Sequence, residues 1–227
     1  MARYLSRIML ITTLFAVSTL FLHGADAPAA PAKENLMAKV LPWIGARPKD
    51  APQKLMLQKG NAIVAIGDSI TAAGGYLREI DTALADFYPA LQLPKITNTG
   101  INGQKAEDLV ARFQKDVVDL KPAVVALSIG INDVWHRLSA PHDENVLKTY
   151  KENVTKMVDM AQAAHIKVIL LTPTIIQEDT EAEGNKRLVQ YADAMKAIAH
   201  EKKCGLADLH AMFLAALKHK PADMKGN

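Results

Sequence analysis

A short apolar run that ends in a turn constrains this chain more than any other feature of its sequence. Residues 62–66 read Ala-Ile-Val-Ala-Ile, and Gly67, Asp68 and Ser69 follow directly. Such a run is typical of a strand that is buried on both faces, as in a parallel sheet. A helical pattern begins near Tyr76, so the segment predicts a strand, a tight turn and a helix. Ser69 would then lie at the carboxyl end of the strand, where open α/β sheets bind their ligands.

The same alternation of short apolar runs and helical patterns continues along the chain. Apolar residues spaced three and four apart predict helices, and short continuous apolar runs predict strands. Strands that alternate with helices predict a parallel sheet with helices on both faces and right-handed connections. The further predicted strands are 95–98, 123–129, 167–171 and 205–209, and the predicted helices are 76–88, 105–120, 144–164, 183–202 and 210–217.

Composition excludes several classes of function. The 227 residues, 49% of them hydrophobic, suit one domain with a short amino-terminal addition. A net charge of +3 without a run of Lys or Arg argues against a nucleic-acid partner. Cys204 is the single cysteine, which excludes an internal disulfide framework and a cysteine-based metal site. We expect no metal and no cofactor.

The amino terminus has the pattern of a secretory signal peptide. Arg3 and Arg7 precede an uncharged apolar stretch, Ile8 to Leu22, and small residues follow. The stretch is shorter than the roughly 20 residues that span a membrane. We therefore expect a signal peptide at 1–25, an irregular lead-in at 26–60, a domain at 61–227, and a secreted or periplasmic protein without a membrane span once the signal is removed.

Two further motifs make the pattern specific. Asn98-Thr99-Gly100-Ile101-Asn102-Gly103 follows the second predicted strand, and Gly130-Ile131-Asn132-Asp133 follows the third. With the Gly-Asp-Ser-Ile turn, and in this order and spacing, they resemble the first three signature blocks of the GDSL/SGNH hydrolase family. The resemblance covers the chain from about residue 61 to 227. It implies a flavodoxin-like three-layer αβα sandwich whose five parallel strands have the order 2-1-3-4-5.

The resemblance also implies an esterase or acylhydrolase for short acyl esters, including acetyl groups on carbohydrate. A serine hydroxyl that attacks an ester needs a base and needs donors for the developing oxyanion. Ser69 is the candidate nucleophile, and the family implies the Gly103 N–H and the Asn132 amide as donors beside the Ser69 N–H. The structural alternatives are a serine that caps a helix, a loop glycine and a turn asparagine. We expect Asp68 and Asp133 to hold loops through backbone hydrogen bonds.

The general base is the part of the family pattern that we do not find. The family's last block is Asp-x-x-His near the carboxyl terminus, and no such block follows the fifth predicted strand. We interpret the sequence as truncated before that block. Asp208 and His210, separated by one residue, are the substitute pair, because a catalytic triad is defined by geometry rather than spacing.

Two other functions stay open. The first is an exported, non-catalytic protein that binds glycan or lipid on the same scaffold. The second, a nucleotide-binding protein of this fold, is disfavoured because Asn98 stands where the dinucleotide fingerprint has its first glycine.

Overall fold

The computed structural model describes residues 56–218, which form one five-stranded parallel sheet. The strand order is β2-β1-β3-β4-β5, which confirms the predicted flavodoxin-like arrangement. The strands are β1 (Ile63–Gly67), β2 (Thr97–Asn98), β3 (Val124–Ser128), β4 (Lys167–Leu171) and β5 (Gly205–Ala207).

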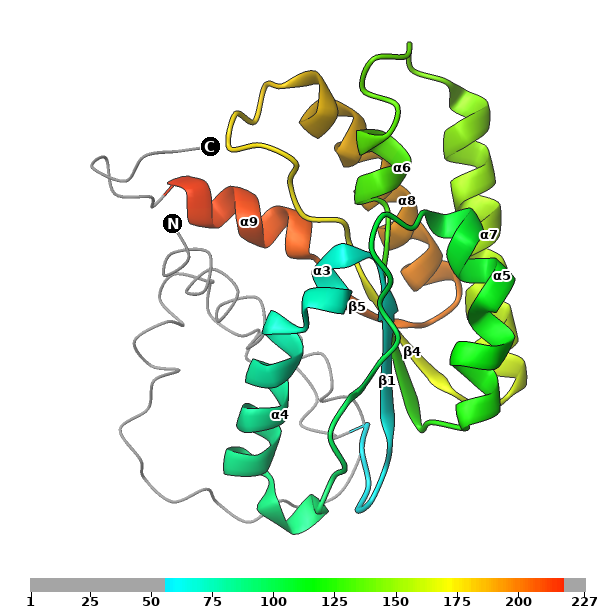
Figure 1. The fold of residues 1–227 in the computed structure, drawn as a ribbon, viewed down its shortest axis with the longest axis vertical. Coiled ribbons are helices and arrows are strands. Elements are labelled where there is room, and N and C mark those ends of the chain that lie inside the picture. Colours follow the sequence, from blue (N-terminus) through cyan, green and yellow to red (C-terminus); the bar gives the residue numbers. More distant parts are fainter. Residues whose placement is uncertain (1–55, 219–227) are drawn as a thin grey trace.

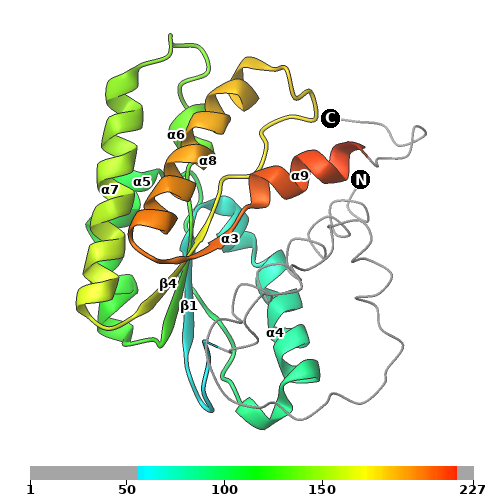
Figure 2. The same ribbon diagram turned by 180° about the vertical axis from the view of Figure 1, so that it is seen from behind.

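Helices cover both faces of the sheet, which gives the predicted three layers. Figures 1 and 2 show α4 and α9 on one side and α5, α7 and α8 on the other. These helices are α4 (Gly75–Phe87), α5 (Ala106–Asp116), α7 (Glu144–Ala163), α8 (Glu183–Glu201) and α9 (Leu209–Lys218). Four shorter helices complete the described chain: α3 (Ser69–Ala73), α6 (Ile131–Trp135), and the 3-10 turns η1 (Pro89–Leu91) and η2 (Val118–Leu120).

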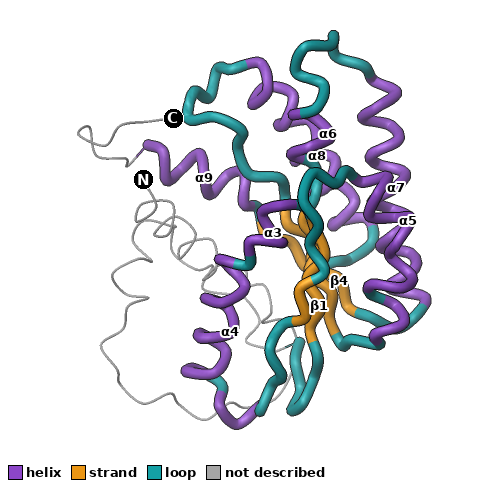
Figure 3. Tube along the Cα trace, in the orientation of Figure 1, coloured by secondary structure: helices purple, strands orange, loops and turns teal. Residues whose placement is uncertain are grey.

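The central strands are apolar on both faces because each face meets a separate hydrophobic cluster. In β1, Val64 and Ile66 pack with the cluster under α5, α7 and α8. Ile63 and Ala65 point the other way and pack with the cluster under α4 and α9. Figure 3 shows the strands between the two groups of helices. The two-sided burial explains why the strand sequence has no polar alternation.

The structure departs from the predicted elements at the carboxyl edge of the sheet. The residues after β1, expected as a turn, form helix α3, and Gly74 ends it in the left-handed conformation with φ of 66°. The predicted helix 105–120 is divided, with α5 ending at Asp116 and η2 following. The strand predicted at 95–98 is limited to Thr97–Asn98.

The expected signal peptide and most of the lead-in lie outside the described residues. Within 56–218, Met56 and Leu57 are buried in the cluster under α4. In this described part of the chain, no helix combines the length and the apolar character needed to cross a membrane.

Candidate active site

Ser69 lies where β1 meets helix α3, at the carboxyl edge of the sheet. Asp68 is the N-cap of α3, and its Oδ1 accepts a 2.9 Å hydrogen bond from the Ile70 N–H. Ser69 is therefore the first residue of the helix, a position whose N–H has no partner within the helix. Its side chain is exposed, and its N–H has no acceptor among residues 56–218. Asp68, and not Ser69, caps the helix.

Two glycines allow the chain to pack closely around α3. A Cβ on Gly67 would lie 2.2 Å from Thr71 Oγ1 and 2.6 Å from the Ser128 carbonyl oxygen. A Cβ on Gly100 would lie 2.3 Å from the Ala72 nitrogen. Any larger residue at these positions would displace α3. Gly100 thus has a packing role in the second motif.

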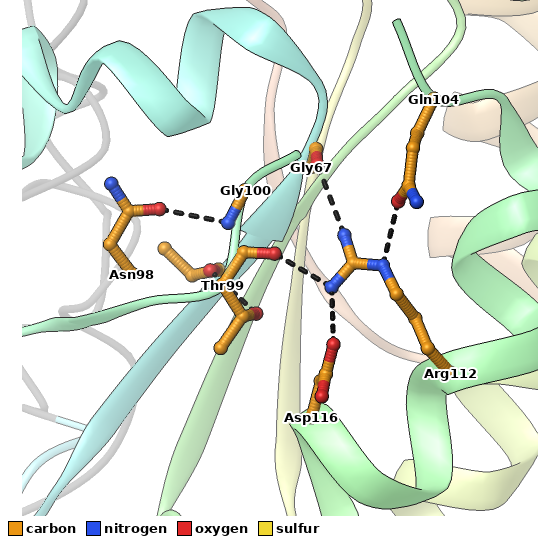
Figure 4. A network of polar contacts seen from close by, with 8 residues as sticks. Gly67, Asn98, Thr99, Gly100, Gln104, Arg112 and Asp116 are labelled. Carbon is orange, nitrogen blue, oxygen red and sulfur yellow. Dashed lines mark hydrogen bonds and ion pairs between the residues drawn. The ribbon is translucent and has the colours of Figure 1, made fainter. Parts of the chain in front are cut away.

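Asn98 joins the second motif to α3. Its Nδ2 donates to the Thr71 carbonyl oxygen at 2.8 Å. Its Oδ1 accepts from the Gly100 N–H at 2.9 Å, as Figure 4 shows. One amide side chain thereby fixes the end of the helix that begins at Ser69 and the start of the loop that leads to Gly103. The sequence alone identified Asn98 only as a position in the motif, because Thr71, its hydrogen-bond partner, is 27 residues away.

Arg112 of α5 ties the same loop to the end of β1. Its guanidinium donates to the Thr99 carbonyl oxygen at 2.7 Å, to the Gly67 carbonyl oxygen at 3.3 Å and to Gln104 Oε1 at 2.6 Å (Figure 4). Asp116, one helical turn further, accepts from the same guanidinium at 2.7 Å. Sequence reasoning missed Arg112, and a basic residue followed by an acid four positions later was the only local signal.

Gly103 and Asn132 lie on two neighbouring segments of this site. Gly103 has a φ of 76°, which favours glycine, and its N–H has no acceptor among the described residues. Asn132, in α6, is 7% exposed, and its Nδ2 donates to the Gln104 carbonyl oxygen at 3.0 Å. An amide nitrogen carries two hydrogens, so the second one is uncommitted. The structure places the Asn132 amide beside the residue that follows Gly103.

The two acids of the motifs hold backbone, as expected from the sequence. Asp133 accepts from the Ala106 N–H, with 3.2 Å to Oδ1 and 3.4 Å to Oδ2. Burial raises the pKa of Asp133 to about 7, and the bond from Ala106 opposes that rise. Burial also raises the pKa of Asp68, against the hydrogen bond from Ile70.

Asp133 makes the stability of the fold depend on pH. Its folded pKa of about 7 lies above the 3.8 of a free side chain, so between pH 4 and 7 the folded state holds a proton that the unfolded state has lost. The free energy of unfolding therefore falls as pH rises through this window. We therefore compare the melting temperature of Asp133→Asn with that of the unsubstituted protein at each pH. The difference, variant minus unsubstituted protein, should become more positive between pH 4.5 and pH 8. A difference in melting temperature that does not change with pH would contradict the raised pKa of Asp133 in the folded state.

The structure does not pair Asp208 with His210. Asp208 Oδ1 accepts from the Thr172 hydroxyl and from the Ala211 N–H, both at 3.1 Å, so this carboxylate caps α9. His210 is 6% exposed, and its Nδ1 donates to the Thr174 carbonyl oxygen at 2.7 Å. The Nε2 atom is buried and has no hydrogen-bond partner among residues 56–218. Neither side chain orients the other.

Ser69 opens onto a cavity of about 430 Å³. Its apolar lining comes from three edges of the fold: Ile70 and Ala73 in α3, Pro173 and Ile175 after β4, and Leu209 and Phe213 in α9. Neither Gly103 nor Asn132 lines this cavity. Trp135, in α6, is 50% exposed, and His136 follows it at the surface. Within residues 56–218 no group of three or more His, Cys, Asp or Glu side chains could hold a metal ion.

Known proteins resemble this chain in sequence and in fold. An acetylxylan esterase of Geobacillus stearothermophilus is 30% identical over 182 residues, which cover 72% of this chain and 83% of that protein. A crystal structure of that esterase matches with a TM-score of 0.65 and 28% identity, covering 73% of this chain and 84% of its own. An α/β hydrolase from the metagenome of Lake Arreo, Spain, matches with a TM-score of 0.66, 30% identity and the same coverage.

Mutant structures of the Geobacillus esterase bear on its active site. Three of them are described as catalytic mutants, in which alanine replaces a serine, an aspartate and a histidine; the aspartate and the histidine are three positions apart. The family model described as GDSL-like lipase/acylhydrolase matches residues 65–226 of the present chain. The chain therefore belongs to the GDSL-like lipase/acylhydrolase family and is a carboxylic ester hydrolase.

Proposed function

We propose that this protein is a secreted serine esterase that hydrolyses short acyl esters, including acetyl groups on carbohydrate, through an acyl-enzyme on Ser69. One observation carries the proposal. Ser69, Gly103 and Asn132 each keep an N–H that has no acceptor among the described residues. The segments that hold them are joined by the hydrogen bonds of Asn98, Arg112 and Asn132 itself. The acetylxylan esterase relatives support the carbohydrate ester as substrate class.

The chemistry follows from these groups. The Ser69 hydroxyl attacks the ester carbonyl carbon while a base takes its proton, and the carbonyl electron pair moves onto the oxygen. The three N–H groups stabilise that oxyanion. The alcohol then leaves with a proton from the base, and water hydrolyses the acyl-enzyme in the same manner. The apolar cavity in front of Ser69 is suited to the acyl group.

The base is a separate part of the proposal. Asp208 and His210 are each hydrogen-bonded elsewhere, and the catalytic mutants of the Geobacillus esterase replace an aspartate and a histidine three positions apart. We place the base in an Asp-x-x-His block encoded downstream of Asn227. Sequencing the coding DNA beyond the Asn227 codon tests this: such a block shortly downstream supports it, and a stop codon directly after Asn227 contradicts it.

The second candidate function is an exported, non-catalytic protein that binds glycan or lipid on the same scaffold. It is favoured by the separate engagements of Asp208 and His210, which do not form an Asp–His pair with each other. Purified full-length protein that binds a glycan but hydrolyses no p-nitrophenyl acetate, with or without Ser69→Ala, would establish it.

Secretion rests on the sequence pattern of residues 1–25. We expect the chain to be cleaved after Ala25 or Ala27 during export, which removes the apolar stretch. The intact mass of the protein recovered from culture medium or periplasm checks this, because a retained stretch would leave the full mass.

Arg112 offers a test of how the donors are positioned. We expect Arg112→Ala to lower kcat for p-nitrophenyl acetate about 10- to 100-fold with little change in KM, because the loop that carries Gly103 loses its anchor to β1. Arg112→Lys should restore little of the lost kcat, since one ammonium group cannot make all the hydrogen bonds of the guanidinium.

Arg187 is the matched control for that substitution. Its side chain is as buried as that of Arg112, at 13% exposed, and it also donates to two carbonyl oxygens, those of Arg137 and Ala140. Arg187→Ala should lower thermal stability while kcat stays near the unsubstituted value. Equal losses of kcat in the two variants would show that Arg112 acts on stability alone.

A further inference from the structure

A second cavity, of about 280 Å³, lies between α5, α6 and α7. It shares no lining residue with the cavity of Ser69. α5 and α7 lie side by side in both ribbon views (Figures 1 and 2), and the lining comes from the start of α5, from α6 and from one side of α7. We refer to this cavity as the α7 cleft.

The α7 cleft contains a buried carboxylate with few donors. Asp133 is 6% exposed and lines the cleft. Its two oxygens lie 3.2 and 3.4 Å from one donor, the Ala106 N–H, and the backbone N–H of Asp133 itself is the second donor. A carboxylate can accept about four hydrogen bonds, and a buried acceptor without donors costs free energy. Asp133 therefore offers strong acceptor capacity to a ligand that carries hydroxyl groups.

The wall of the cleft on α7 carries no charge, and beside Val146 and Tyr150 it includes three polar side chains. Asn145, Thr149 and Asn153 are spaced four residues apart, which places them on one side of the helix. Asn145 and Thr149 are exposed and Asn153 is half-buried, and none of these side chains has a hydrogen-bond partner among residues 56–218. Amides and hydroxyls both donate and accept, so this row is suited to groups that do the same.

The charges around the cleft argue against an ionic ligand. Lys105 pairs with Glu107, and Arg137 lies 3.7 Å from a carboxylate oxygen of Asp143. Both cations are thus already compensated, which disfavours phosphate or another anion. No group of three side chains that could hold a metal ion occurs among the described residues. A neutral ligand with several hydroxyl groups fits this set of side chains.

We propose that the α7 cleft is an accessory site for a neutral sugar, in which hydroxyl groups donate to Asp133 and bond to Asn145, Thr149 and Asn153. Its volume lies near the lower end of the roughly 300–1,000 Å³ of small-molecule sites, which suits one or two sugar rings. The site stands independently of ester hydrolysis; only xylose as the first sugar to test rests on the proposed function.

The experiment is a calorimetric titration of the full-length protein with unacetylated xylotetraose, repeated with cellotetraose, inorganic phosphate and spermidine. The test variant is Thr149→Val with Asn153→Leu, which preserves side-chain size and removes the polar groups. The matched control is Thr155→Val, also on α7 but not in the cleft. We expect the double variant to bind the neutral oligosaccharide at least tenfold more weakly, and Thr155→Val and Ser69→Ala to bind it normally.

Three outcomes overturn the inference: equal affinity in the double variant, binding of phosphate or spermidine in preference to the sugars, or no binding of either oligosaccharide. Hydrolysis of p-nitrophenyl acetate is measured in parallel and should not change in the double variant. Sugar binding that depends on the α7 cleft, together with no hydrolysis, would support the accessory site and contradict the esterase proposal. The experiment therefore distinguishes the two proposals.

Discussion

Replacing Ser69 by alanine should reduce the hydrolysis of p-nitrophenyl acetate by the full-length protein to the background rate, a loss of about 10⁴-fold or more. The reason is that no other group then forms the acyl-enzyme. The remaining N–H donors would still bind the carbonyl oxygen, so weak catalysis above water is compatible with the mechanism. Initial rates over a range of substrate concentrations give kcat and KM for the comparison.

Ser128 provides the control within the same cavity. It also lines the cavity of Ser69, at the end of β3, and is 9% exposed. Ser128→Ala should keep kcat within about threefold. A mass-spectrometric search for a covalent acyl group on the peptide that contains Ser69 adds direct evidence. Undiminished hydrolysis in Ser69→Ala, or an acyl group on another serine, would refute the nucleophile.

Removing the amide of Asn132 should lower kcat by about 10²–10³, the usual cost of one oxyanion donor. KM should change little, because the bond to the oxyanion forms only in the transition state. Asn132→Asp tests the same point with a side chain of almost equal size that has no N–H to donate. We expect it to be at least as impaired as Asn132→Ala.

The bond from Asn132 to the Gln104 carbonyl oxygen could produce a loss of activity through instability instead. Thermal unfolding of both variants separates the two effects, since a variant that stays folded at the assay temperature cannot owe a hundredfold loss of kcat to instability. A kcat within threefold of the unsubstituted protein would remove Asn132 from the oxyanion site.

The positions of the strands and the two-sided core follow closely from local sequence. The apolar runs of β1, β3 and β4 had no polar alternation because both faces of each strand are covered. The predicted strand and helix positions therefore agree with the structure to within a few residues for these elements. Periodicity alone did not specify the order 2-1-3-4-5, which came from the family resemblance and is confirmed.

The contacts that build the site depend on residues far apart in the chain. Asn98 meets Thr71 across 27 residues, and Arg112 meets Gly67 across 45, so no local pattern identifies either as a positioning residue. The division of roles between Gly100 and Gly103 likewise needs the packing of Gly100 on Ala72, which is a tertiary contact.

For Asp208 and His210, local spacing suggested a pair that the structure does not form. Their spacing suggested a substitute for the missing block, but the sequence could not reveal that Asp208 caps α9 or that His210 Nδ1 donates to the Thr174 carbonyl oxygen. By itself the sequence determined the nucleophile candidate, the layers and the family, because these depend on apolar periodicity and short motifs. Tertiary structure decided which polar side chains meet, because hydrogen bonds act over about 3 Å between segments that only folding brings together.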